Sequence, residues 1–141
     1  MTNTLKFGTL DASYQAAGQL EGIIKLVDAF YDYMERLPEA AEIRAMHRED
    51  LSDSRKKLSY FLSGWLGGPK LYKEHFGGIS IPQVHSHLKV GAEQRNAWML
   101  CMKHALKDQD YSDDFKKYMF EQLSVPAERI RQVCSHAQDS E

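Results

Sequence analysis

Hydrophobic and polar residues follow a helical period in four stretches of the chain. The clearest stretch runs from Leu20 to Leu37, where Lys25, Asp28, Asp32 and Glu35 occupy the polar face. Its apolar positions recur at intervals of three and four residues: Leu20, Ile23, Ile24, Val27, Phe30, Tyr31 and Met34. That spacing matches the helical repeat of about 3.6 residues and predicts an amphipathic helix with one buried face.

A second helix is predicted to begin near Ser52, a residue type that often caps a helix N-terminus. The triplet Gly67-Gly68-Pro69 ends the pattern, because glycine and proline terminate helices. The expected buried stripe of this helix consists of Leu58, Phe61, Leu62 and Trp65.

The third predicted helix runs from about Ala92 to Leu106, and a fourth occupies much of the segment from Asp113 to Ala137. Pro126 is expected to kink the fourth helix. The expected buried face of the third helix contains Trp98, Cys101, Met102 and Ala105. No alternating pattern predicts a strand, so the fold class is all-α.

The 141 residues are expected to form a single domain, because a chain of this size with 43% hydrophobic residues can bury one core. Residues 1–13 are predicted to be a poorly packed N-terminal extension, and residues 138–141 a C-terminal tail. A long irregular connection is predicted from Gly67 to about Ser80.

The charge pattern argues against two classes of partner. The net charge is −2 and no basic stripe is interleaved with aromatic residues, so nucleic acid is not an expected partner. No apolar run approaches about 18 residues, and the start "MTNTLKFGTLDASYQ" lacks the features of a secretion signal. A cytoplasmic protein without a membrane partner is therefore expected.

Cys101 and Cys134 form no CxxC pair and are expected to be reduced thiols.

The candidate chemistry consists of scattered histidines and aromatic residues, because no GxSxG, P-loop, GxGxxG or HExxH motif occurs. His85 and His87 are separated by one residue, and residues two apart do not face each other on a helix, so a shared metal is not expected there. Taken alone, Tyr31 is expected to be a core tyrosine bonded to a backbone carbonyl. His47 then reads as an exposed loop residue and Trp98 as part of the core.

Four motifs in order, "LVDAFYDYM", "FLSGWLGGPKLY", a histidine and "NAWMLCMKHAL", resemble the truncated haemoglobins, and specifically their second group. The resemblance spans the chain from about Tyr14 to Val133. It implies a two-over-two helical sandwich around haem b, which is iron protoporphyrin IX.

The resemblance also implies the residue that ligates the iron. In that group the proximal histidine lies sixteen residues after the GGP triplet and thirteen before the tryptophan, and both counts lead to His85. A neutral imidazole is the usual proximal ligand in globins, and the opposite face of the haem stays open for a gas. His87 would project elsewhere, toward a haem propionate or solvent.

Three distal groups are implied by the same resemblance: Tyr31, Trp98 and His47 would donate hydrogen bonds to a bound diatomic ligand. Ser54 falls where other globins often place a distal histidine or glutamine, and it is too short to ligate iron. Lys57 is expected to reach a propionate. The full set of expected haem contacts is Phe30, Ser54, Lys57, Leu58, Phe61, Leu62, Tyr72 and His87.

Two classes of haem function remain open at this stage, since a fold does not choose between them. The protein would bind dioxygen reversibly, along with other diatomic ligands such as carbon monoxide and nitric oxide, or it would detoxify nitric oxide or peroxide as an enzyme. The enzymatic role needs a separate reductase, because the chain has no flavin or nicotinamide motif. The alternative without haem is a helical interaction module whose aromatic stripe is only core.

Overall fold

Helices make up nearly all of the regular structure in the computed structural model, which describes residues 11–47, 49–76 and 91–139. The elements are α1 (Ala12–Ala16), α2 (Gln19–Arg36), the 3-10 helix η1 (Pro38–Ala40), α3 (Ala41–Ala45), α4 (Ser52–Trp65), α5 (Leu71–Phe76), α7 (Ala92–Lys107) and α8 (Asp113–Asp139). These described ranges contain no strand, which confirms the all-α prediction.

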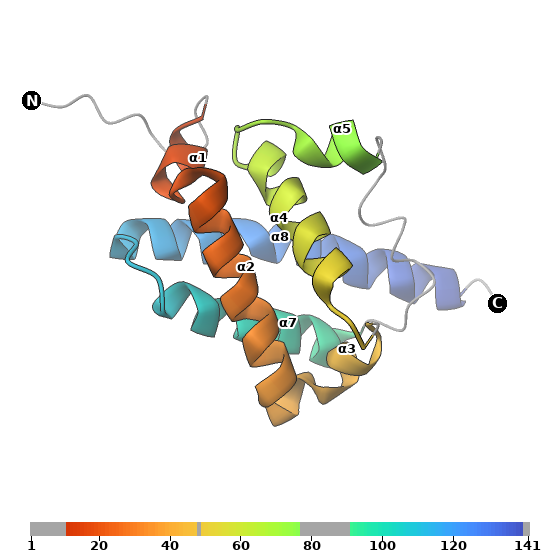
Figure 1. The fold of residues 1–141 in the computed structure, drawn as a ribbon. Coiled ribbons are helices and arrows are strands. Elements are labelled where there is room, and N and C mark those ends of the chain that lie inside the picture. The colour runs from red at the N-terminus through yellow and green to blue at the C-terminus, as the bar shows by residue number, and fades with distance from the viewer. Residues whose placement is uncertain (1–10, 48, 77–90, 140–141) are drawn as a thin grey trace, which may run out of the picture.

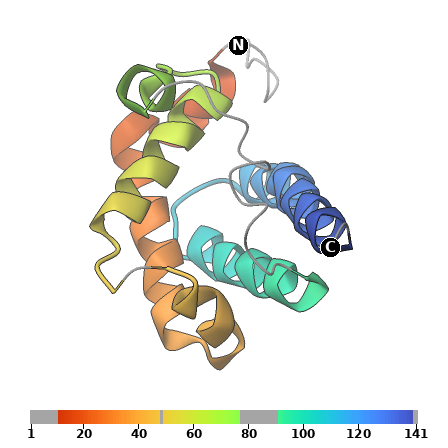
Figure 2. The same cartoon turned by 90° about the vertical axis from the view of Figure 1, so that its right-hand side faces the viewer.

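The long helices form two layers that cross each other (Figures 1 and 2). Helix α2 packs against α4 in one layer, and α7 packs against α8 in the other. Helix α2 also packs against α7, so it connects the two layers. This arrangement confirms the predicted two-over-two sandwich.

Helix α2 matches its prediction to within one residue at each end. Ile23, Leu26, Val27, Phe30 and Met34 are fully buried, as an amphipathic stripe requires. The prediction was wrong for Ile24, whose side chain is 40% exposed. Ile24 follows the fully buried Ile23 directly, and one helical step turns its side chain away from the core.

The tight corner between α1 and α2 explains why glycine stands at position 22. A Cβ on Gly22 would lie 2.0 Å from the carbonyl oxygen of Ala17, so any larger residue collides with the backbone. Tyr111 reaches the same corner, and its hydroxyl donates to the Ala17 carbonyl oxygen at 2.8 Å. Ser13 of α1 is also buried, although residues 1–13 were expected to be poorly packed; residues 1–10 lie outside the described part.

The start of α4 differs from its prediction. Ser52 is the first residue of the helix, and it makes no capping bond as the residue before the helix would. The Asp50 carboxylate is the side chain that accepts hydrogen bonds at this turn: one from the Ser52 N–H at 2.9 Å and one from the Ser52 hydroxyl at 2.7 Å. Aspartate and serine are both common in this turn, so residue type alone does not choose between them.

A short helix occupies part of the connection that was predicted to be irregular. Helix α5 begins after Pro69, with the Leu71 N–H donating to the Pro69 carbonyl oxygen at 2.9 Å. Tyr72 and Phe76 lie one turn apart on it, with ring centroids 5.1 Å apart. Six residues are too few to display a helical period, which explains why the prediction was wrong here.

Helices α7 and α8 begin where the sequence predicted and extend slightly further. Helix α8 continues through Pro126, and the kink expected there stays a prediction.

Cys101 is buried in α7, and this burial raises the pKa of its thiol to about 11, so the thiol is protonated at neutral pH. Among the residues described, no helix has the length and apolar content to cross a bilayer.

Candidate functional site

Four aromatic side chains from three parts of the chain form a continuous series of ring contacts, and we call them the aromatic cluster: Phe30, Tyr31, His47 and Trp98. The Phe30 ring lies 4.9 Å from the Trp98 ring and 5.0 Å from the Tyr31 ring, centroid to centroid. The Tyr31 ring is also 5.8 Å from His47, edge to face. The structure thus brings together the three residues that the sequence assigned to the distal side, with Phe30 between two of them.

The Tyr31 hydroxyl is a buried donor with a weak partner. Its side chain is 5% exposed, and the hydroxyl lies 3.5 Å from the carbonyl oxygen of Ser54. Strong O–H···O bonds are about 2.7 to 2.8 Å long, so this contact leaves most of the donor capacity of the hydroxyl unused. Burial raises the pKa of Tyr31 to about 12, against the opposing charge of Arg55. The hydroxyl therefore keeps its proton at neutral pH and can donate it in a hydrogen bond.

The hydrogen bond of His47 determines which of its nitrogens carries a proton. Nδ1 lies 2.7 Å from the carbonyl oxygen of Ile43, and because a carbonyl only accepts, Nδ1 must be the donor. In a neutral imidazole the other nitrogen, Nε2, is then an acceptor. The donor role that the resemblance implied for His47 is consequently restricted to its charged form.

Helix α4 supplies the wall next to the aromatic cluster. Leu62 is fully buried, whereas Leu58, Phe61 and Trp65 are half-buried and pack against the core. Ser54 contributes its backbone carbonyl to Tyr31, which is a role that its side-chain type did not predict.

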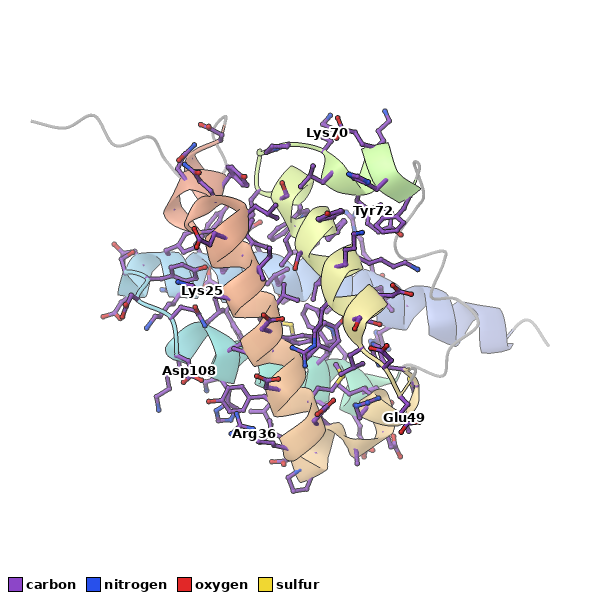
Figure 3. All side chains as sticks on the ribbon, in the orientation of Figure 1. Lys25, Arg36, Glu49, Lys70, Tyr72 and Asp108 are labelled. Carbon is purple, nitrogen blue, oxygen red and sulfur yellow. The ribbon has the colours of Figure 1, made fainter. Side chains whose placement is uncertain are left out.

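Lys57 and Tyr72, two further residues expected to contact haem, lie at the corner between α4 and α5. The Lys57 ammonium is 5.6 Å from the centre of the Phe76 ring, and the Tyr72 ring packs against the same phenylalanine. Figure 3 shows Tyr72 next to α5, far from Glu49 at the other end of α4. Of the expected haem contacts, Phe30 and Ser54 therefore lie next to Tyr31, and Lys57 and Tyr72 lie next to Phe76.

His85 and His87 lie outside the described residues. Their assignment as proximal ligand and neighbour stays a prediction. Within the described ranges, no group of three or more histidine, cysteine, aspartate or glutamate residues is placed to hold a metal ion.

The described residues do fit the haem that the resemblance implies. Haem presents a broad apolar ring, and Leu58, Phe61, Trp65 and Trp98 provide large apolar side chains that are only half-buried. A hydrogen-bond donor on the open side of haem favours retention of dioxygen, and the Tyr31 hydroxyl, with its long contact to Ser54, is such a donor. The residues present thus combine an apolar wall with one buried hydrogen-bond donor.

A separate cleft of about 230 Å³ lies between the η1–α3 segment and the start of α7. It shares no residue with the aromatic cluster and is lined by Pro38, Glu39, Ala41, Glu42, Ile43, Glu93, Gln94 and Ala97. Its acidic lining does not suit an apolar ring with acidic substituents, so we assign the candidate site to the aromatic cluster.

Arg55 is the functional neighbour that sequence reasoning missed. Its guanidinium lies 5.6 Å from the centre of the Tyr31 ring and forms ion pairs with Asp28 and Asp32. The sequence held one signal for it, since Asp28 and Asp32 are one turn apart on α2 and Tyr31 lies between them. Two acidic residues flanking a tyrosine indicate a basic partner, although they do not say which one.

Comparison with known proteins identifies the family. The model of the bacterial-like globins matches residues 12–132. A group 2 truncated haemoglobin of Bacillus subtilis is 30% identical over 122 residues, covering 86% of this chain and 89% of that protein. The group II two-on-two haemoglobin of Agrobacterium tumefaciens superposes with a TM-score of 0.81 at 29% identity, covering 93% of this chain and 98% of the other.

A truncated oxygen-avid haemoglobin from Bacillus subtilis is also similar, with a TM-score of 0.76 at 29% identity and coverage of 84% of this chain and 97% of the other. The matches cover both the two-layer fold and the segments that carry the aromatic cluster. The chain therefore belongs to the bacterial-like globin family and, within it, to the group II truncated haemoglobins, which are haem-binding globins.

Proposed function

We propose that this protein binds dioxygen reversibly at haem b, with His85 as the proximal ligand and Tyr31 as the main group that retains the gas. The observation that supports this proposal most is the buried Tyr31 hydroxyl, whose contact with the Ser54 carbonyl is 3.5 Å long. The name of the similar Bacillus subtilis structure, which describes an oxygen-avid haemoglobin, points in the same direction.

When bound, haem supplies a ferrous iron with one open position for a diatomic molecule. The residues of the chain then determine how long the gas stays. Tyr31 would donate its hydroxyl in a hydrogen bond to a gas held at this position. Trp98 has an indole N–H as a second donor, and Phe30 fixes the tryptophan ring against α2. The apolar side chains of Leu58 and Phe61, which pack against the core, would lower the polarity around these bonds and so strengthen them.

Reversible oxygen binding can be tested directly on the reduced, haem-loaded protein. We expect its visible spectrum to change on equilibration with air and to return to the original spectrum when oxygen is removed under inert gas. Rapid conversion to the ferric spectrum in air would contradict the proposal. Steady turnover of nitric oxide or peroxide with an added reductase, without reversible oxygen uptake, would replace it with the enzymatic alternative.

His47 is expected to tune the site without holding the haem. In His47→Phe an aromatic ring remains against Tyr31, while the bond from Nδ1 to the Ile43 carbonyl is lost. We expect oxygen release to change by about two- to fivefold, because a neutral hydrogen bond contributes about 0.5 to 1.5 kcal/mol and acts here only through the position of Tyr31. Stopped-flow measurement of oxygen release and a pyridine haemochrome assay of haem content test both parts. Loss of haem from this variant would contradict the assignment.

A further inference from the structure

The Arg55 side chain bridges from α4 to α2 at the level of Tyr31. Its Nη1 donates to the Asp28 carbonyl oxygen at 3.1 Å and to the Asp28 carboxylate at 3.2 Å. Its Nη2 donates to the Asp32 carboxylate at 3.0 Å. Both terminal nitrogens of the guanidinium therefore form hydrogen bonds, and together they fix the plane of the group, which a single ion pair would not do.

The same guanidinium covers the solvent side of the Tyr31 ring. Its central carbon is 5.6 Å from the ring centre, which is within the range of a cation–π contact. The Arg55 side chain is 26% exposed, whereas Tyr31 beneath it is 5% exposed. Arg55 thus lies between the tyrosine and solvent.

The hydroxyl of Tyr31 faces the same part of α4 through its long contact. Its acceptor is the carbonyl oxygen of Ser54, the residue directly before Arg55. The first turn of α4 is itself fixed by the bond from the Arg55 N–H to the Leu51 carbonyl oxygen at 2.9 Å. Both the ring and the hydroxyl of Tyr31 consequently depend on where residues 54 and 55 lie relative to α2.

From these contacts we infer that Arg55 is a positioning residue for the gas site: it fixes the separation of α2 and α4 at Tyr31 and thereby aims the Tyr31 hydroxyl. The inference rests on the proposed function, in which Tyr31 retains the gas. Arg55 touches neither haem nor gas in this role and acts only through Tyr31. Loss of the Arg55 guanidinium should change the oxygen release rate when the Tyr31 hydroxyl is present and should leave the rate unchanged when that hydroxyl is absent.

The test compares Arg55→Gln, Tyr31→Phe and the double variant. We expect Arg55→Gln to speed oxygen release by about three- to tenfold, which is the factor that corresponds to loss of a partly shielded cation–π contact. In the Tyr31→Phe background the same substitution is expected to change the rate by less than about twofold, because coupled residues show non-additive effects. Arg55→Lys keeps the charge but cannot reach both carboxylates as a planar fork, and it is expected to give an intermediate rate.

A second measurement reports on Tyr31 without any gas. In protein loaded with zinc protoporphyrin, NMR of labelled tyrosine gives the rate at which the Tyr31 ring flips, and we expect Arg55→Gln to raise it. Arg36→Gln is the matched control, because Arg36 also lies on a tyrosine ring of α2, at 4.5 Å from Tyr33, and its replacement removes the same charge. Figure 3 shows Arg36 at the end of α2, far along the helix from the α1 corner. This control is expected to leave both the Tyr31 flip rate and oxygen release unchanged.

The outcomes separate this inference from the proposed function. An unchanged flip rate in Arg55→Gln would overturn the positioning role, and so would an equal effect on oxygen release with and without the Tyr31 hydroxyl. A raised flip rate together with an unchanged release rate in Tyr31→Phe would support the positioning role and overturn the proposed retention of oxygen by Tyr31.

Discussion

His85→Ala is expected to lose most of its haem, whereas His87→Ala is expected to keep a near-normal visible spectrum. The spacing from the GGP triplet and from Trp98 leads to His85 in both directions, which is the basis for naming it the proximal ligand. Removal of a residue that only orients a metal ligand weakens binding by about 10- to 100-fold, and removal of the ligand itself should cost at least as much.

The measurement is haem retention after gel filtration, together with the Soret band of each variant. His87→Ala serves as the control, because it removes an imidazole two residues away while leaving His85 intact. Added imidazole should restore a six-coordinate or five-coordinate spectrum in His85→Ala, since the small molecule can replace the missing ligand. A normal spectrum in His85→Ala with loss of haem in His87→Ala would reverse the assignment.

Tyr31→Phe is expected to speed oxygen release by about ten- to a hundredfold. A hydrogen bond to a charged group contributes about 1.5 to 3 kcal/mol, and each 1.4 kcal/mol corresponds to about tenfold in rate. Phenylalanine keeps the ring contacts with Phe30 and His47, so the variant removes the hydroxyl with little change in packing. The rate is measured by stopped-flow replacement of oxygen with carbon monoxide.

The size of the change in oxygen release rate in Tyr31→Phe alone depends on Trp98. If its indole N–H holds the same gas atom, it compensates for the lost hydroxyl, and the two substitutions are not additive. Trp98→Phe and the double variant complete the cycle, and the double variant is expected to release oxygen fastest. Unchanged rates in both Tyr31→Phe and the double variant would rule out retention by these donors, and would leave the haem fold without its polar distal side.

The helices were predictable because their signals are long and periodic. Helix α2 shows seven apolar positions at intervals of three and four residues, and its observed bounds differ by one residue at each end. Helix α5 has six residues, and the Ser52 cap depended on a choice between neighbouring polar residues that both suit the turn. Short elements and caps are decided by contacts with the rest of the fold, which a local pattern does not contain.

The candidate site was predictable where a motif carried it. Tyr31, Trp98 and His47 came from the family resemblance, and the structure places Tyr31 and Trp98 against Phe30 and His47 against Tyr31. The expectation from chemistry alone, that a buried tyrosine bonds a backbone carbonyl, is also seen in the long contact with Ser54. Arg55 lies on a different helix from its partners Asp28 and Asp32, 27 and 23 residues away along the chain, and the protonated nitrogen of His47 depends on one carbonyl. The two acidic residues beside Tyr31 indicate a basic partner without identifying Arg55, and no sequence pattern indicates which nitrogen of His47 is protonated.

The placement of Phe30 and Tyr31 side by side on α2 has a consequence for how such a protein can change over evolution or by design. Both residues belong to one rigid helix that packs against both layers, so a substitution that shifts one ring also shifts the other. His47 and Arg55 belong to other elements, and each contacts Tyr31 from outside α2. Under the proposed function, we expect variation at these two positions to adjust gas retention in small steps while α2 and the core packed against it stay as they are.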